Sequence, residues 1–175
     1  DLVMSVLEIP VEAALRAMAL GQKHGVKTIL NPAPAQPLPP AAFQHIDYLT
    51  PNETELRILL GLTPDDATPT LELAQQLRRY GVGTLIVTLG DEGALILTET
   101  GSEKVPGVAV KVVDTTGAGD AFNSGLAVAL AAGKPLRAAV SYANCAGAIA
   151  CTKLGVIPSL GTRTQVDQLY AEYYG

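Results

Sequence analysis

Apolar and polar residues follow two patterns along this chain, short continuous apolar runs and longer stretches with helical periodicity. The runs have the length of strands, and they predict strands at Leu2 to Leu7, Val26 to Leu30, Ile46 to Leu49, Thr84 to Leu89, Gly93 to Leu97 and near Val108 to Val113. The run Thr84 to Leu89 is almost wholly apolar and β-branched, which is typical of a strand covered on both faces. The periodic stretches predict helices at Val11 to Ala19, Glu53 to Leu60, Leu71 to Tyr80, Ala118 to Ala132, Leu136 to Cys151 and Thr164 to Tyr173. Strands that alternate with helices favour an α/β fold with a mainly parallel central sheet flanked by helices on both faces.

Glycine and proline residues mark the breaks between these elements. Gly21 and Gly25 are predicted to end the first helix, and Gly61 is predicted to end the second. The run Asn31-Pro32-Ala33-Pro34-Ala35 can continue neither a strand nor a helix and predicts a rigid loop. No repeat, linker or low-complexity tract interrupts residues 1–175, so we expect a single portion of one domain. Because ligands bind outside the carboxyl ends of the strands in such sheets, the loops there are expected to hold the chemistry.

The composition narrows the classes of function. With 48% hydrophobic residues, the chain can bury a sizeable core and is not disordered. Its formal net charge is −5 and its 12 Lys and Arg residues are spread thinly, so no basic stripe is available for nucleic acid or an anionic membrane. The longest apolar runs fall short of the roughly 18 to 20 residues that a membrane span needs. We therefore expect no nucleic-acid partner and no membrane partner.

The cysteines and the start of the chain bear on its cellular context. Cys145 and Cys151 lie in one predicted helix at a separation that places them on different faces, too far apart for a disulfide. Reduced core thiols fit a cytoplasmic protein. The chain opens directly into a strand at Asp1, with neither a signal peptide nor an initiator Met, and it is expected to be a segment of a longer protein.

The strongest chemical feature is the string Asp114-Thr115-Thr116-Gly117-Ala118-Gly119-Asp120-Ala121-Phe122, between a predicted strand and a long predicted helix. Gly117 and Gly119 let backbone N–H groups converge at the helix N-terminus, where the helix dipole also favours a phosphate. Asp120 falls in the first turn, where its carboxylate could accept a proton from a hydroxyl that attacks a phosphoryl group. A tight turn with an acidic first-turn residue is the structural alternative. A Walker loop and a Rossmann fingerprint are both absent.

The full nine-residue string resembles the signature of the ribokinase or PfkB family of carbohydrate kinases. Asn31-Pro32-Ala33-Pro34-Ala35, Thr50-Pro51-Asn52-Glu53-Thr54-Glu55 and Thr88-Leu89-Gly90-Asp91-Glu92-Gly93 are similar to three further motifs of that family, in the expected order. The resemblance covers the entire chain and implies a ribokinase-like fold. It corresponds to the second half to three-fifths of a full ribokinase, so the family's N-terminal part, with its sugar-binding Gly-Gly segment and β lid, is absent from this chain.

The resemblance implies a role for each matching position. Asp120 is similar to the family's catalytic base, and the amides of Gly117, Ala118 and Gly119 are similar to its anion hole. The remaining positions are Asn52 and Glu55 for Mg²⁺, Thr88, Gly90 and Gly93 for ATP, Asn144 for the adenine and Glu8 for the ribose. Structural alternatives stay open, because Asn52 and Glu55 could form a helix cap, the glycines a hairpin, and Glu8 a solvated strand end.

The family resemblance also implies a K⁺ site. Its ligands would be the Asp114 side chain and backbone carbonyls, namely those of Thr116, Ala150, Lys153, Gly155 and Ser159. Oxygen ligands suit a hard cation. Because the chain has few basic residues, Mg²⁺, K⁺ and backbone dipoles would compensate most of the phosphate charge, and K⁺ would act by ordering the anion hole.

The function that this resemblance implies is ATP-dependent phosphorylation of ribose at its primary hydroxyl, giving ribose 5-phosphate. Deoxyribose, fructose, another sugar or a nucleoside are alternative acceptors, and a non-catalytic nucleotide-binding remnant is the alternative of a different class. The intact enzyme is expected to be a homodimer. The isolated chain is expected to be inactive without its sugar clamp and lid. His24, His45, the pair Asp65-Asp66 and the tyrosines Tyr170, Tyr173 and Tyr174 are predicted to be structural or solvated residues.

Overall fold

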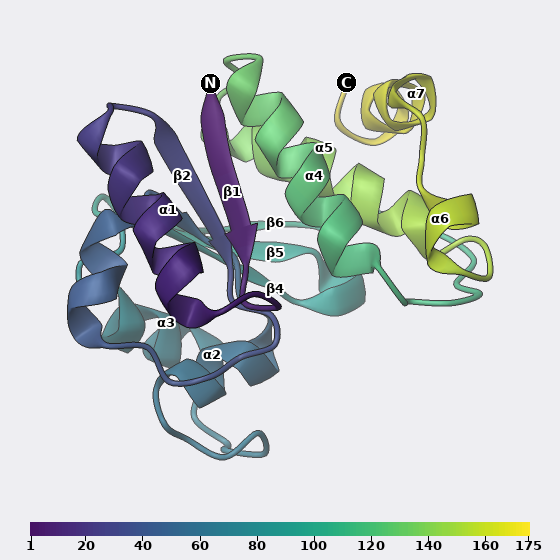
Figure 1. Cartoon of the computed structure of the whole chain (residues 1–175). Coiled ribbons are helices and arrows are strands. Elements are labelled where there is room, and N and C mark those ends of the chain that lie inside the picture. Colours follow the sequence, from purple (N-terminus) through teal and green to yellow (C-terminus); the bar gives the residue numbers. More distant parts are fainter. The chain divides into compact units, whose positions relative to one another are not determined.

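A sheet of six strands in the order β1-β2-β3-β4-β5-β6 organises the first part of the chain (Figure 1). The computed structural model describes all residues, 1–175. The strands are β1 (Leu2–Val6), β2 (Lys27–Asn31), β3 (Tyr48–Leu49), β4 (Thr84–Thr88), β5 (Ala94–Leu97) and β6 (Ser102–Val105). The chain divides into two compact units, Asp1–Leu89 with Leu95–Lys104 and Gly90–Ala94 with Val105–Gly175.

The first four strands are parallel, and each pair has a defined register. Met4 of β1 pairs with Ile29 of β2, Ile29 also pairs with Tyr48 of β3, and Leu49 of β3 pairs with Leu85 of β4. The predicted α/β fold with a mainly parallel sheet is therefore confirmed. Parallel pairing places the carboxyl ends of β1 to β4 at the same edge of the sheet, which is where the loops of the candidate site begin.

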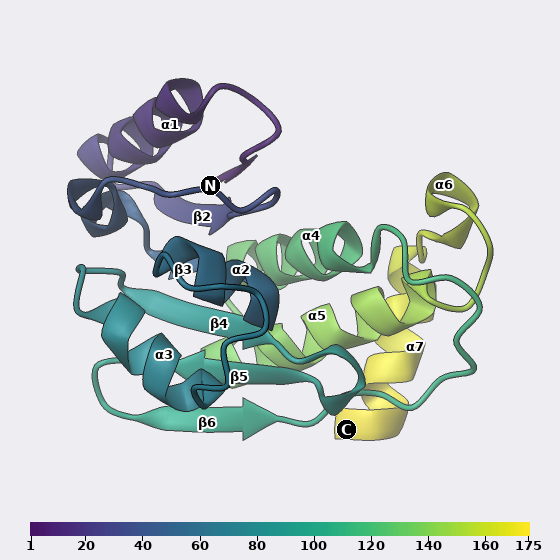
Figure 2. The same ribbon diagram turned by 90° about the horizontal axis from the view of Figure 1, so that it is seen from below.

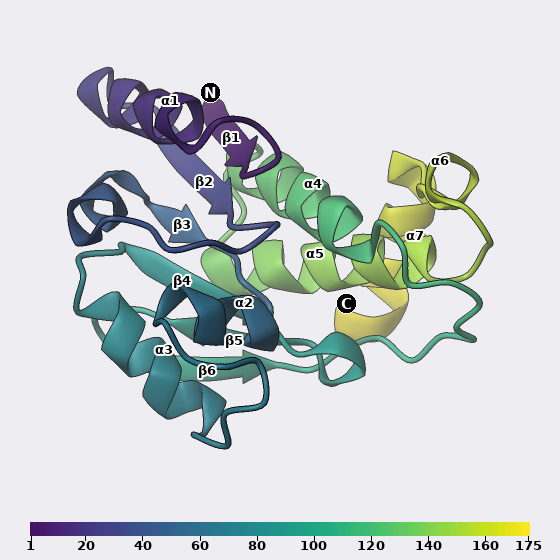
Figure 3. The same ribbon diagram turned by 60° about the horizontal axis from the view of Figure 1, so that its bottom comes forward.

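Helices α1 (Val11–Lys23), α2 (Glu53–Leu59) and α3 (Thr70–Arg78) bury the sheet of the first unit. Helix α1 packs on β1 and β2, whereas α2 and α3 pack on β4 (Figure 3). Two 3₁₀ turns, η1 (Pro40–His45) and η2 (Gly90–Glu92), complete the connections. Leu85, Ile86 and Val87 in the middle of β4 are fully buried, as the continuous apolar run predicted.

The second unit consists mainly of α4 (Ala118–Ala131), α5 (Leu136–Ala150), α6 (Val156–Ser159) and α7 (Arg163–Tyr174). Helices α4 and α5 lie side by side (Figure 2) and pack closely because their facing residues are small. A methyl group added to Gly125 would stand 2.8 Å from the Cβ of Ala146, so the two backbones nearly touch. Helix α7 packs against α5.

Two sequence predictions are wrong in detail, and one strand was not predicted. No strand forms near Val108 to Val113, because Val112 and Val113 stay 57% and 55% exposed and no strand pairs with them. Gly21 does not end α1, which continues to Lys23. The absence of a Cβ at Gly21 instead lets the helix approach β2, because an added Cβ would stand 2.6 Å from the Thr28 methyl carbon. Strand β6 was not predicted, because only its last residue is buried.

The two cysteines and the apolar character of the helices also bear on the sequence predictions. Cys145 and Cys151 are both free thiols, as predicted, although Cys151 is only partly buried. Burial raises the pKa of the Cys145 thiol to about 12, so this thiol is protonated and unreactive at neutral pH. None of the helices combines the length and apolar character that crossing a bilayer requires.

Candidate functional site

The N-terminus of α4 carries the candidate phosphate site of the second unit. Gly117 is the N-cap and has a φ of 79°, a left-handed conformation that favours glycine. The Ala118 N–H donates to the Thr115 carbonyl at 3.1 Å, whereas the N–H groups of Gly117 and Gly119 have no acceptor within the chain. Of the three predicted anion-hole amides, two are thus available to a ligand, and the third closes the turn that presents them.

Asp120 lies in the first turn of α4, directly after these amides. Its side chain is exposed and forms no ion pair with any residue of the chain. A carboxylate with no cationic partner remains available to accept a proton or a ligand hydrogen bond. Three residues further along, the Asn123 Nδ2 donates to the Gly119 carbonyl at 2.9 Å and fixes the peptide that leads into Asp120.

Asp114 joins the beginning of the signature string to the turn before α6. One carboxylate oxygen, Oδ1, accepts from the N–H and the hydroxyl of Thr116 at 3.0 and 2.7 Å, and Oδ2 accepts from the Gly155 N–H at 3.1 Å. The Thr116 N–H, the Thr116 hydroxyl and the Gly155 N–H, in that order, hold the pKa of Asp114 below its usual range. Each donor is neutral, so the carboxylate charge has no cationic partner within the chain.

A carboxylate without a cationic partner is an oxygen ligand of the type that hard cations bind, so Asp114 fits a monovalent cation. The structure joins Asp114, Thr116 and Gly155 by hydrogen bonds. It joins none of the other predicted ligands to Asp114 in this way, these being Ala150 at the end of α5, the exposed Lys153, and Ser159, whose buried hydroxyl donates to the Val156 carbonyl at 2.7 Å. No group of three or more His, Cys, Asp and Glu residues is arranged so that it could hold a metal ion.

The predicted nucleotide turn of the second unit is held by direct backbone contact. Gly90 and Gly93 have φ values of 60° and 97°, and the Gly93 N–H donates to the Gly90 carbonyl at 3.2 Å. A Cβ on Gly93 would stand 2.2 Å from the Val105 carbonyl oxygen, and a Cβ on Gly107 would stand 2.1 Å from the Asp91 carbonyl oxygen. The turn therefore packs on the segment after β6 at a distance that only paired glycines allow.

Asn144 of α5 contacts the same segment. Its side chain is 8% exposed, and its Nδ2 donates to the Pro106 carbonyl at 3.0 Å. The Tyr174 hydroxyl also donates to the Pro106 carbonyl. Pro106, Gly107 and the Tyr174 hydroxyl were not among the predicted site residues. For Pro106 and Gly107, the Pro-Gly pair itself was the sequence feature that could have indicated a turn at this position.

Asn52 and Glu55, in the first unit, form a capping box at the start of α2. Asn52 Oδ1 accepts from the Glu55 N–H at 2.8 Å, and Glu55 Oε2 accepts from the Asn52 N–H at 2.8 Å. Desolvation raises the pKa of Glu55, and the hydrogen bond from the Asn52 N–H opposes that shift. The structure thus realises the helix-cap alternative, while Glu55 Oε1 accepts no hydrogen bond within the chain. That oxygen fits Mg²⁺, which binds through one or two carboxylates and keeps several waters.

Thr88 and Glu8 lie at the carboxyl ends of two strands of the first unit, β4 and β1, which are separated in the sheet by β2 and β3. Thr88 ends β4, donates its N–H to the Pro51 carbonyl at 3.0 Å and forms a parallel bridge with Asn52. Glu8 is exposed in the loop after β1. The Leu7 N–H donates to the Ala33 carbonyl at 2.9 Å, which ties this loop to the predicted proline-rich loop. The structure therefore pairs Thr88 with Asn52, and places Glu8 next in the chain to a residue bound to Ala33.

Comparisons with known proteins agree on one family. A family model described as "pfkB family carbohydrate kinase" matches residues 3–163. Ribokinase from Haemophilus influenzae is 37% identical over 165 residues, which cover 94% of this chain and 54% of that protein. Deoxyribokinase from Salmonella typhi is 41% identical over 123 residues, which cover 70% of this chain and 40% of that protein.

A solved structure extends the agreement to the fold. Arabidopsis thaliana ribokinase, complexed with ribose and ATP, matches with a TM-score of 0.89 at 31% identity, covering 97% of this chain and 55% of that one. The predicted ribokinase-like fold is confirmed. The chain spans about half the length of the ribokinases that it matches.

The close contact at Gly93 predicts a difference between two glycines of the same turn. Gly93→Ala is expected to lower the free energy of unfolding by about 3 kcal/mol or more, because its methyl group would meet backbone that cannot move aside. Gly90→Ala is the matched control: its φ is also positive but its Cβ would meet nothing within 4 Å, so we expect a loss of about 1 kcal/mol. Urea unfolding of the two variants measures the difference, and equal losses would contradict the close contact.

The lowered pKa of Asp114 predicts a pH dependence of stability. A carboxyl group whose folded pKa lies below its unfolded value of about 3.9 stabilises the protein above that value, and this stabilisation is lost as the pH falls through the folded pKa. The free-energy difference between the parent protein and Asp114→Asn should therefore be full at neutral pH and shrink in acid. Urea unfolding without added K⁺, from neutral pH to about pH 2, measures it. A difference that stays constant over this range would show that the carboxylate charge is not involved.

Proposed function

Because this chain belongs to the pfkB family of carbohydrate kinases, we propose that the protein containing it transfers the γ-phosphoryl group of ATP to the primary hydroxyl of ribose. The products are ribose 5-phosphate and ADP. The observation that carries the proposal is the combination, at the N-terminus of α4, of an unpaired Asp120 with the two unused N–H groups of Gly117 and Gly119. Ribokinases among the relatives, and the ribose and ATP bound by the Arabidopsis protein, support ribose as the acceptor.

In the proposed reaction, Asp120 accepts the proton of the sugar hydroxyl as that oxygen forms a bond to the γ-phosphorus. The bond from this phosphorus to the bridging oxygen breaks, and its electron pair leaves with ADP. The amides of Gly117 and Gly119, with the dipole of α4, would stabilise the charge on the transferring oxygens. Ala118 contributes by holding the turn through its bond to Thr115.

The other residues of the proposed site bind or orient. Thr88, Gly90, Gly93 and Asn144 would hold ATP, and Glu8 would bind a ribose hydroxyl. Asn52 and Glu55 would hold Mg²⁺ with its waters, while Asp114 and the carbonyls of Thr116, Ala150, Lys153, Gly155 and Ser159 would hold K⁺. When bound, these cations would compensate phosphate charge, for which the chain offers few basic side chains. Asp114 would transmit K⁺ binding to the anion hole because it is bonded to Thr116, next to Gly117.

Two alternatives to this proposal are another acceptor sugar and a non-catalytic, nucleotide-binding role. Deoxyribose is the nearest alternative acceptor, since a deoxyribokinase is among the relatives. The proline-rich loop and Glu8 favour ribose. A non-catalytic nucleotide-binding remnant would have no need for a base, and the presence of Asp120 argues against it.

We also propose that the intact enzyme is a cytoplasmic homodimer. These 175 residues alone are proposed not to phosphorylate a sugar.

An acceptor panel tests the substrate. The intact enzyme that contains this chain should show its highest kcat/KM with ribose among ribose, deoxyribose, fructose and several nucleosides, in an ADP-release assay with MgATP. The panel is run in KCl and in NaCl at matched ionic strength, and turnover should be faster with K⁺ because of the Asp114 donor set. A clearly higher kcat/KM for another acceptor would overturn the assignment of ribose.

Replacement of the proposed base tests the mechanism. Asp120→Asn in the intact enzyme should lower kcat by about 10² to 10⁴, the usual contribution of a general base, and should leave MgATP affinity nearly unchanged. Glu172→Gln, which alters an exposed acid of α7, is the control for a general effect of lost charge. Turnover of Asp120→Asn close to that of the control would remove Asp120 from the mechanism.

A further inference from the structure

Two adjacent tyrosines at the end of α7 bind the segment that follows β6. The Tyr174 hydroxyl donates to the Pro106 carbonyl, and the Tyr173 hydroxyl donates to the Ala109 carbonyl at 3.0 Å. These two side chains therefore hold residues 106–109 at two points. Nothing else in the second unit binds these two carbonyls except Asn144, whose Nδ2 shares the Pro106 oxygen.

The segment held in this way contacts the proposed nucleotide turn through Gly107, the residue after Pro106. Gly107, directly after Pro106, donates its N–H to the Glu92 carbonyl at 3.2 Å, and its Cα lies against the Asp91 carbonyl oxygen. Gly93 packs on the same segment from the other side of the turn. A displacement of Pro106 would therefore move the turn, because the two backbones have no side chains between them to absorb the change.

Asn144 lies on the same network. Its Nδ2 stands 3.0 Å from the Pro106 oxygen and 3.5 Å from the Tyr174 hydroxyl oxygen. Tyr174 thus contacts both the backbone that supports the turn and the side chain proposed for the adenine.

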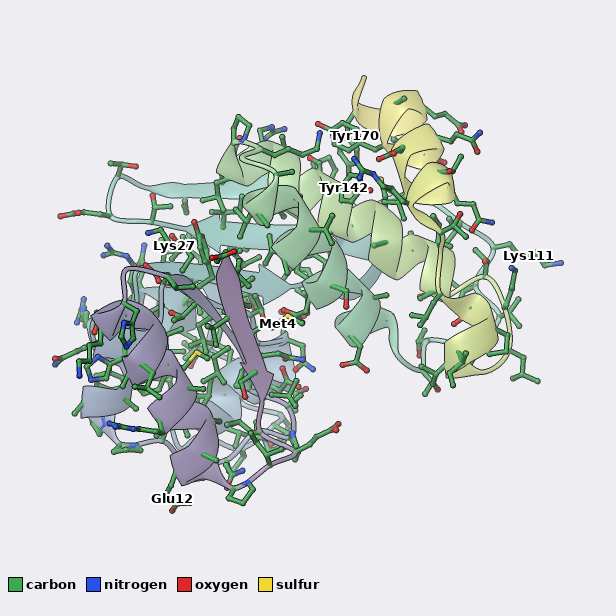
Figure 4. The ribbon with its side chains drawn as sticks, turned by 45° about the horizontal axis from the view of Figure 1, so that its top comes forward. Met4, Glu12, Lys27, Lys111, Tyr142 and Tyr170 are labelled. Atoms are coloured by element: carbon green, nitrogen blue, oxygen red, sulfur yellow. The ribbon has the colours of Figure 1, made fainter.

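Helix α7 is itself fixed on α5, so the tyrosines are presented by a rigid element. The Tyr142 hydroxyl of α5 donates to Asp167 at 3.0 Å, and the rings of Tyr142 and Tyr170 lie 5.8 Å apart between the two helices (Figure 4). The Lys134 ammonium stands 4.9 Å from the Tyr170 ring centre, a cation–π distance. A capping box of Thr162 and Gln165 fixes the start of the helix.

We infer that Tyr173 and Tyr174 are positioning residues for ATP, which hold residues 106–109, and through them Asn144 and the Gly90–Gly93 turn, in the nucleotide-binding geometry. This inference rests on the proposed function. The hydroxyl groups act on backbone carbonyls and not on the nucleotide. Their loss should weaken ATP binding without slowing phosphoryl transfer, because the base Asp120 belongs to α4 and has no hydrogen bond to this network.

Removal of each hydroxyl tests the inference in the intact enzyme. Tyr174→Phe keeps the ring and loses the bond to Pro106, so the KM for MgATP should rise by about 2- to 10-fold, the factor that one hydrogen bond is worth, with kcat within about 2-fold of the parent. The double variant Tyr173→Phe/Tyr174→Phe should raise it further. Tyr170→Phe is the matched control, since the Tyr170 hydroxyl has no hydrogen bond within the chain and lies on the same helix.

Hydrogen exchange of the Gly93 and Gly107 amides gives a readout that needs no activity. Both should exchange faster in Tyr174→Phe than in Tyr170→Phe, because residues 106–109, which include Gly107 and pack against Gly93, have lost one of their anchors. Unchanged exchange in Tyr174→Phe, or a fall in kcat with KM unchanged, would overturn the inference. A parent enzyme that fails to bind MgATP in calorimetry would instead overturn the proposed function, whatever the exchange rates are.

Discussion

Backbone packed directly on backbone is the constraint on which the candidate site of the second unit depends. Gly93 and Gly107 allow the 90–93 turn and the segment after β6 to approach so closely that neither could carry a side chain. Such a contact has almost no freedom to adjust, since there are no rotamers to change. Because the contact cannot adjust, the turn keeps its position only if the segment after β6 keeps its own. Asn144 and the two tyrosines of α7 hold that segment by hydrogen bonds to its backbone carbonyls.

The candidate phosphate site at the N-terminus of α4 also consists mainly of backbone groups. The chain has 12 Lys and Arg residues, none of which pairs with Asp114, and the groups that the N-terminus of α4 itself offers to a polyanion are N–H groups and the helix dipole. Backbone donors need no reorganisation when charge develops on a transferring group, provided that the turn is fixed beforehand. The hydrogen bond that the Ala118 N–H donates to Thr115 fixes the turn, together with the bonds that Asp114 accepts from the N–H groups of Thr116 and Gly155.

The sequence predicted what depends on burial and missed what depends on partners. Apolar runs identified β1 to β5, and most residues of β2, β4 and β5 are buried, because a strand covered on both faces must be apolar whichever residues cover it. The same rule failed at Val112 and Val113, where β-branched residues have no neighbouring strand, and at β6, where Glu103 and Lys104 are exposed. The predicted site residues at α4 followed from a local string. The hydroxyl groups of Tyr173 and Tyr174 could not be placed in this way, because their acceptors are backbone carbonyls, which leave no trace in the sequence.

Asn52 and Glu55 show why a structural and a functional explanation of one motif need not compete. The capping box occupies Asn52 Oδ1 and Glu55 Oε2, which fixes both side chains at the N-terminus of α2, and the parallel bridge to Thr88 fixes the backbone that carries them. A carboxylate fixed through one oxygen presents the other in a constant direction, at no further cost in side-chain entropy when a ligand arrives. Partial burial, which raises the pKa of Glu55, also means that a cation there would meet less competition from water. The cap would then orient Glu55 for the proposed hydrated Mg²⁺, and loss of Asn52 would disturb both the N-terminus of α2 and the proposed metal position.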